Sequence, residues 1–180
     1  MIIKMKKIYS LILSFVMVIS MFFSATPIQA STTTSGDGWS LQNGVLTVTK
    51  NIKRYLGYGW DDYSDEITKV VVKEGVISLD TYQFADLTYL TSVSLPSTLK
   101  TIEYNAFAND VSLESISLPS GLTEVGSQAF MNTGVKSVVL PGAIYGDQVF
   151  ANCVNLKSVT IQSGAELSTA MFNKCTRLQS

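Results

Sequence analysis

The chain has 180 residues, of which 46% are hydrophobic, and this is enough for one domain with a buried core. Its formal net charge of −1 argues against a nucleic-acid partner, because there is no excess of cations to neutralise phosphate groups. The absence of histidine excludes Ser-His and Cys-His nucleophile pairs and every zinc site that uses histidine.

The first 30 residues have the pattern of an export signal. Three lysines lie within residues 4–7, and an uncharged run, "IYSLILSFVMVISMFF", follows from Ile8 to Phe23. This run is shorter than the roughly 20 residues that a membrane-spanning helix needs, so we favour a cleaved signal over a membrane anchor. Cleavage near Ala30 predicts a secreted or cell-surface protein whose only membrane contact is made by this signal segment.

Residues 31–38 and 39–66 precede the main part of the chain. The first segment, "STTTSGDG", is small and polar, which predicts a flexible leader. The second begins with two alternating stretches that flank Asn43-Gly44, a strong signal for a two-residue β-hairpin. We expect residues 39–66 to form an N-terminal cap, because a stacked structure would otherwise expose its first layer to water.

The predicted cap is rich in aromatic and acidic residues. Its aromatic residues are Tyr55, Tyr58, Trp60 and Tyr63. They suggest either a carbohydrate platform, since aromatic faces stack on sugars, or a cluster that packs on Val70 and Leu79, which we favour. Its acidic residues are Asp61, Asp62, Asp65 and Glu66. Several hard oxygens suit calcium, but the D-x-D-x-D-G spacing is missing, so we predict a solvated loop and no metal.

Residues 67–180 contain five copies of one pattern, with a period of 20 to 23 residues. The clearest column is phenylalanine: Phe84, Phe107, Phe130, Phe150 and Phe172. Short alternating segments such as "SVSL" and "SISL" predict short strands with one buried face. A unit this small cannot bury its apolar side alone, so it must stack on its neighbours. We therefore predict a repeat solenoid, a right-handed horseshoe of short parallel β-strands about 4.8 Å apart.

The repeated text resembles a known family. Leu95-Pro96-Ser97, Ala106-Phe107 and Asn109 recur as Leu118-Pro119-Ser120, Ala129-Phe130 and Asn132. This pattern is similar to that of the BspA-type leucine-rich repeat, and the similarity covers about residues 67–180. The resemblance implies an exported or surface protein of bacteria with an adhesin-like surface for protein or matrix partners.

Two units depart from the pattern. The first has Gln83 where the pattern has alanine. The fourth is two residues short before its phenylalanine, so we expect Tyr145 or Ile144 to fill the position that Ile102 holds in the second unit. We also expect a local distortion at the fourth unit.

Two further columns carry polar or thiol side chains. Asn109, Asn132 and Asn152 follow their phenylalanines by two residues, and asparagine at such positions satisfies backbone groups in tight turns. Cys153 and Cys175 follow theirs by three residues, which makes them neighbours in adjacent units. Their parallel Cβ directions suit a disulfide poorly, so we favour free thiols over a bond.

The outward face of the strands is the candidate binding surface. We assign to it, as binding residues, Ser92, Ser94, Ser115, Ser117, Ser137, Val139, Ser158 and Thr160. These side chains are small, most can form hydrogen bonds, and few charges lie among them. Extended solenoid faces bind partners in such proteins, although a merely solvated face is the alternative. The face lacks aromatic residues, which counts against stacking on sugars.

The sequence has no paired carboxylates, no glycine-rich phosphate loop and no activated nucleophile, so we predict no enzyme, no catalytic residue and no cofactor. We expect an exported module that adheres to a protein, extracellular-matrix or cell-surface ligand. The alternative is a spacer or accessory domain of a larger secreted enzyme or surface protein. The chain stops where a sixth strand should begin, so we expect further repeats or domains after Ser180, or pairing through that end.

Overall fold

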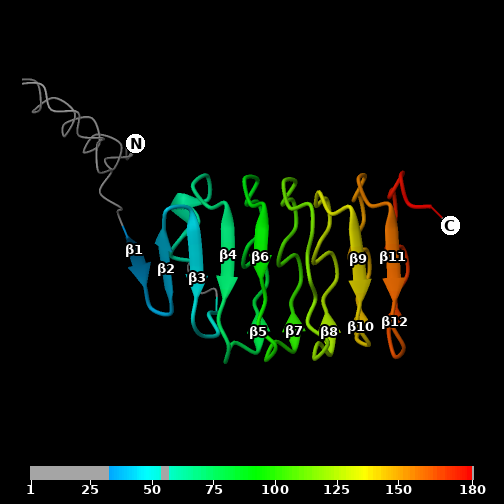
Figure 1. The fold of residues 1–180 in the computed structure, drawn as a ribbon, viewed down its shortest axis with the longest axis horizontal. Coiled ribbons are helices and arrows are strands. Elements are labelled where there is room, and N and C mark those ends of the chain that lie inside the picture. Colours follow the sequence, from blue (N-terminus) through cyan, green and yellow to red (C-terminus); the bar gives the residue numbers. More distant parts are fainter. Residues whose placement is uncertain (1–32, 54–56, 180) are drawn as a thin grey trace, which may run out of the picture. The chain divides into compact units, whose positions relative to one another are not determined.

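The computed structural model describes residues 33–53 and 57–179 (Figure 1). The predicted signal segment, residues 1–30, and Tyr55 lie outside the described residues. Over the described part, the backbone winds into a β-solenoid of about five turns whose repeat strands pair in parallel. The predicted repeat solenoid is therefore confirmed.

One sheet begins at the N-terminal end and has the order β1-β2-β3-β4-β6. Its strands are β1 (Thr34–Gly36), β2 (Trp39–Gln42), β3 (Val45–Val48), β4 (Lys69–Val72) and β6 (Ser92–Ser94). β2 and β3 form an antiparallel hairpin, and β3 then pairs in parallel with β4, the strand of the first repeat. Farther along the chain, β9 (Ser137–Leu140) and β11 (Ser158–Ile161) form a separate parallel pair. The outward side of β4, β6, residues 115–118, β9 and β11 is called the front face below.

A second sheet runs through all the repeats without interruption (Figure 1). Its strands are β5 (Ser78–Leu79), β7 (Thr101–Ile102), β8 (Glu124–Val125), β10 (Ile144–Tyr145) and β12 (Glu166–Leu167), and every pairing is parallel. The one helix in the described residues is the 3-10 helix η1 (Asp61–Tyr63). No helix in this part of the chain has the length and apolar character needed to cross a membrane.

The expectation of a flexible leader is wrong for Thr34–Gly36. These residues form β1 and pair antiparallel with β2. Gly36 permits the pairing, because a Cβ atom at that position would collide with the indole of Trp39. In the hairpin turn that follows β2, Asn43 has φ 49° and Gly44 has φ 75°, the left-handed values that a tight two-residue turn requires.

The core of the solenoid is a ladder of phenylalanine rings. Successive rings from Phe84 to Phe172 have centroids 5.2 to 6.0 Å apart. The ladder continues beyond its first phenylalanine to Trp60, whose ring stacks on Phe84 at 5.9 Å and on Tyr58 at 5.0 Å. Trp60 is 1% exposed, so the packing interpretation of the aromatic cluster holds for it. Burying one such side chain contributes about 1.5–3 kcal/mol, which is why the units stack.

Left-handed residues flank each phenylalanine at fixed positions. Two residues before the ring they are Tyr82, Asn105, Gln128, Gln148 and Ala170, and two residues after it they are Asp86, Asn109, Asn132, Asn152 and Lys174. Asparagine tolerates this conformation, so the asparagine column does lie in tight turns. The expectation that its side chains satisfy backbone groups is not met among the described residues, where Asn109 Nδ2 donates to Asp86 Oδ1 instead. The amide of Asn132 also donates to Asn109 Oδ1 at 3.0 Å, which links adjacent turns.

Tyr145 accommodates the short fourth unit. It pairs with Val125 in the second sheet, and Val125 pairs with Ile102, so Tyr145 rather than Ile144 takes the predicted position. Its ring is 1% exposed, and its hydroxyl donates to Pro141 O at 3.0 Å. The distortion expected at this unit is not seen in the second sheet, which continues through β10, because the large tyrosine side chain fills the space.

Candidate binding surface

The eight side chains assigned from the sequence are all exposed on the front face. They form four pairs: Ser92 with Ser94 on β6, Ser115 with Ser117 in residues 115–118, Ser137 with Val139 on β9, and Ser158 with Thr160 on β11. Alternate side chains of a strand point to the same side, which places each pair outward. The register of β9 and β11 aligns two of the pairs, so that the two pairs form adjacent rows.

The front face is interrupted between β6 and residues 115–118. In the described part of the chain, no strand pairing joins these two segments, and Ser115 forms an isolated bridge to Ser137 on the other side. At the same turns, the second sheet continues from β7 to β8. The interruption therefore divides the assigned residues, leaving Ser92 and Ser94 on the sheet of β4 and the other six beyond it.

The six residues beyond the interruption line a single groove, called the front groove below, with a volume of about 340 Å³. Its lining is Ser115, Ile116, Ser117, Leu118, Ser137, Val138, Val139, Ser158 and Thr160. Ile116 is 8% exposed and Val138 is 4% exposed, so these side chains form an apolar floor under the exposed hydroxyl groups. Sequence reasoning did not assign the floor residues, although they are the inward members of the same alternating segments.

The hydroxyl groups of the front face have no partner within the described chain. None of the assigned serines, nor Thr160, forms a side-chain hydrogen bond there. Hydroxyl groups in the turns behave differently: Thr98 Oγ1 donates to Val76 O at 2.9 Å, and Thr123 Oγ1 donates to Lys100 O at 3.1 Å. Each front-face hydroxyl therefore keeps one donor and two acceptor sites for solvent or a partner.

Charge plays little part in the front groove, since no charged side chain lines it. An ion pair precedes two of its segments in sequence, with Lys136 Nζ 2.6 Å from Glu114 Oε2. Its side chains are 51% and 63% exposed, so solvent screens the pair and it adds little stability. The groove is therefore suited to contacts made by shape and hydrogen bonds.

The two cysteines are not activated for chemistry. Cys153 Sγ donates to Phe130 O at 3.1 Å, and Cys175 Sγ donates to Phe150 O at 3.0 Å. Burial raises the pKa of the Cys153 thiol, and burial together with the nearby Cys153 raises the pKa of the Cys175 thiol to about 11. Both are free thiols in the structure. A protonated thiol is a poor nucleophile and metal ligand, so the pair offers neither activity.

One buried carboxyl group lies in the same column as the cysteines. Asp110 is 0% exposed; its Oδ1 accepts from Leu87 N at 2.9 Å, and its Oδ2 has no partner in the described chain. Burial raises the pKa of Asp110 well above its ordinary value. The group does not line the front groove, so we assign it no catalytic role. Among the residues that the structure describes, no group of three or more Asp, Glu, Cys or His side chains could hold a metal ion.

Comparison with known families gives one clear match. The sequence model of the BspA-type leucine-rich repeat region matches residues 62–179, more than half of the chain, in six copies. A search of the curated proteins found no match.

Solved structures of bacterial leucine-rich repeat proteins are similar to this one. A protein from Bacteroides ovatus has a TM-score of 0.62 at 24% identity, and the match covers 82% of this chain and 44% of that one. A protein from Eubacterium ventriosum has a TM-score of 0.56 at 26% identity, covering 70% and 42%. The T. pallidum leucine-rich repeat protein has a TM-score of 0.52 at 19% identity, covering 86% and 90%. This chain thus spans less than half the length of the first two proteins.

Proposed function

The chain belongs to the BspA-type leucine-rich repeat family, and on that premise we propose that it is a non-catalytic module that binds a protein partner through the front groove. Leucine-rich repeat proteins generally bind proteins. On this chain the binding site is the front groove. The module is exported, and it adheres to a protein of the extracellular matrix or of a cell surface.

One observation carries the choice of site. Six exposed residues chosen for their outward position line one groove, and none of their hydroxyl groups is used inside the described chain. The cores of protein interfaces are depleted of charge and combine apolar contact with hydrogen bonds. A floor of buried valine and isoleucine beneath free hydroxyl groups has this composition.

Export is supported by the sequence of residues 1–30, with its lysines followed by an uncharged run that is too short to span a membrane. We expect the mature chain to begin after Ala30 and to be found in the medium or on the cell surface. Amino-terminal sequencing of the mature protein tests this directly. A mature protein that retained residues 1–30 would contradict cleavage.

The experiment for the binding proposal uses purified full chain and a panel of immobilised extracellular-matrix proteins, with binding followed by surface plasmon resonance. We expect at least one member of the panel to bind. The double variant Ser115→Lys, Ser117→Lys should abolish that binding, because two long, charged side chains then fill the groove. If no matrix protein binds, or if the double variant binds like the unmodified chain, the proposal is wrong.

A spacer or accessory role in a longer protein is the second candidate. It is favoured by the fact that this chain spans 44% and 42% of the two relatives from Bacteroides ovatus and Eubacterium ventriosum. In that case, charged replacements in the front groove leave every activity of the longer protein unchanged, while removal of whole repeats changes the distance between its other parts.

A further inference from the structure

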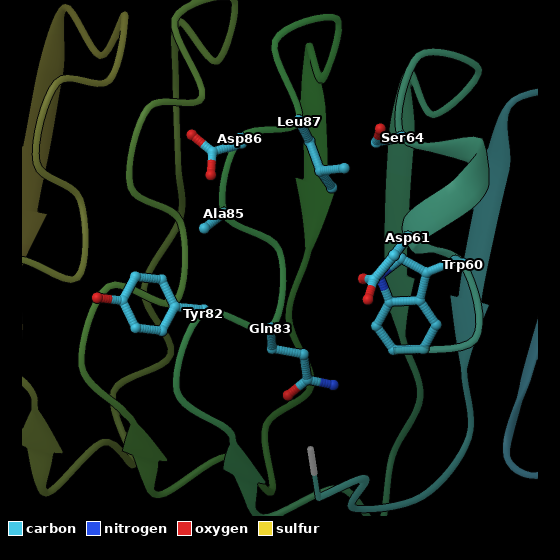
Figure 2. Close-up of a pocket in the computed structure, with 8 residues that line it drawn as sticks. All are labelled: Trp60, Asp61, Ser64, Tyr82, Gln83, Ala85, Asp86 and Leu87. Carbon is cyan, nitrogen blue, oxygen red and sulfur yellow. The ribbon is translucent and has the colours of Figure 1, made fainter. Parts of the chain in front are cut away.

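A second cavity lies between helix η1 and the turn that carries Phe84. Its volume is about 210 Å³, and we call it the junction pocket. Figure 2 shows Trp60, Asp61 and Ser64 on the side of η1, facing Gln83 and Leu87 of the first repeat across the pocket. None of these residues lines the front groove, so the two sites are separate.

Gln83 is the unusual residue of this pocket. It directly precedes Phe84, and the next two repeats have alanine at that position, Ala106 and Ala129, both 0% exposed. Gln83 is itself 1% exposed, so a polar amide occupies a place that a small apolar side chain fills elsewhere. Sequence reasoning recognised this departure but found no reason for it.

The amide of Gln83 has a fixed orientation and one unused end. Its Oε1 accepts from Asp80 N at 2.7 Å, while its Nε2 has no partner in the described chain. In Figure 2 the nitrogen lies at the end of the side chain that faces Trp60, across the junction pocket. A buried donor without a partner destabilises a protein, so an acceptor from outside the chain would offset the cost of this residue.

The opposite wall supplies an acceptor and a hydroxyl group. Asp61 Oδ2 accepts from Tyr58 N at 2.8 Å, and its other oxygen has no partner among the described residues. The carboxylate points toward the first repeat in Figure 2, and Ser64 lines the same wall of the pocket at the end of η1. The carboxylate of Asp86, which also lines the pocket, is instead held by Asn109 Nδ2 at 2.8 Å and points away.

The amide nitrogen of Gln83 and the carboxylate of Asp61 determine which kind of ligand fits the junction pocket. A cation would meet the donor end of Gln83, and an anion would meet the carboxylate of Asp61. A neutral molecule that carries both donors and acceptors satisfies both walls, and adjacent hydroxyl groups do so with one oxygen accepting and the next donating. The volume is below the ~300–1,000 Å³ typical of pockets for drug-sized ligands, which suits a single small ring.

We propose that the junction pocket binds one monosaccharide residue, with Gln83 Nε2 donating to a sugar oxygen and Asp61 accepting from a neighbouring hydroxyl group. Leu87 and the edge of Trp60 supply the apolar contact for the C–H groups of the ring. The aromatic cluster thus contributes to a carbohydrate site by forming a wall, because its tryptophan face is already covered by Phe84 and Tyr58.

The test is saturation-transfer NMR with purified full chain and the methyl glycosides of glucose, galactose, mannose and N-acetylglucosamine. At least one glycoside should show transfer. Gln83→Ala should weaken its binding about tenfold or more, because the donor is lost. This variant restores the residue of the next two repeats, so it should fold with an unchanged or higher Tm.

Asp61→Asn provides a second variant, and Asp62→Asn is its matched control. Both positions lie in η1, but Asp62 does not line the pocket. Asp61→Asn should weaken glycoside binding about fivefold, because a charged acceptor makes the stronger hydrogen bond, and Asp62→Asn should not change it. The proposal is overturned if no glycoside shows transfer, if Gln83→Ala and Asp61→Asn bind like the unmodified chain, or if calcium chloride alone saturates the pocket.

Discussion

Hydroxyl groups occur in two settings in this solenoid, and they are used differently. In the turns, Thr98 and Thr123 donate to carbonyl groups of the preceding unit. On the front face, Ser117 and Thr160 have no such partner within the described chain. Stacking of the repeats therefore depends on the first set and not on the second, which leaves the front face able to vary with the partner that it binds.

The aromatic ladder, like the turn hydroxyl groups, connects adjacent units, and its side chains make the largest contacts between them. Phe130 stacks on Phe107 and on Phe150 with centroids 5.2 Å away on both sides, and it is 0% exposed. A residue of this kind holds two units at once. Side chains on the front face make no such contact between units. A substitution in the ladder should therefore lower the free energy of unfolding more than a substitution on the front face.

The largest effect is expected for Phe130→Ala. Loss of a fully buried ring with a neighbour on each side should lower the free energy of unfolding by about 3–5 kcal/mol. Phe172→Ala is the matched control, because that ring is only partly buried and has Phe150 on one side. Urea unfolding followed by circular dichroism measures both. Equal losses at the two positions would break the distinction between inner and terminal rings.

Asp110→Asn tests whether the buried carboxyl group of Asp110 is protonated, and so uncharged, in the folded protein. Burial raises the folded-state pKa of Asp110, so the stability that its protonated form confers is complete below the unfolded pKa of about 3.9 and is lost as pH rises through the folded pKa. Each unit of difference corresponds to about 1.4 kcal/mol. The variant should therefore gain stability over the unmodified chain as the pH rises above about 4 toward the folded pKa.

Urea unfolding of both proteins at about pH 4 and at a neutral pH measures this difference. Other groups titrate equally in both, so their effects cancel in the difference. A gap in stability that stays constant with pH would show that Asp110 is not the group responsible.

A smaller effect separates the two kinds of hydroxyl most cleanly. Thr98→Val removes a donor to Val76 O and an acceptor of Gly75 N, and it should cost about 1–2 kcal/mol. Thr160→Val makes the same change of side chain on the front face and should alter stability by less than about 0.5 kcal/mol. Thermal unfolding of the pair is sufficient. Similar losses in the two variants would mean that the front-face hydroxyl has a structural partner after all.

The sequence was sufficient for the repeat but not for its irregularities. The period placed all five phenylalanines in one ladder, because equivalent positions of successive stacked units lie next to one another. Trp60 lies 24 residues before Phe84 and is the sixth ring of the ladder, but the sequence did not reveal this. The residues around Trp60 do not match the rest of the repeat pattern. Asp110 follows Phe107 by three residues, and nothing in the sequence around it predicts burial, because it becomes buried only when the neighbouring units stack over it.

The front face shows the limit most plainly. "SVSL" at residues 92–95 and "SISL" at 115–118 are almost the same text, yet the first contains β6 and the second is not a regular strand. Alternation predicts which side chains point outward, because it is a local property. The interruption of the sheet and the groove beside it depend on how neighbouring turns fit together, and a four-residue pattern does not encode this.

The most direct test of the binding site compares two exposed apolar residues on the two sheets. Val139 on β9 is 48% exposed and lines the front groove, and Ile144 on β10 is 56% exposed on the second sheet. Val139→Glu and Ile144→Glu are each measured for affinity to the matrix protein that the full chain binds. We predict at least a tenfold loss for Val139→Glu, about 1.4 kcal/mol, and no change for Ile144→Glu. Equal affinities, or a loss confined to Ile144→Glu, would contradict the assignment of binding to the front groove.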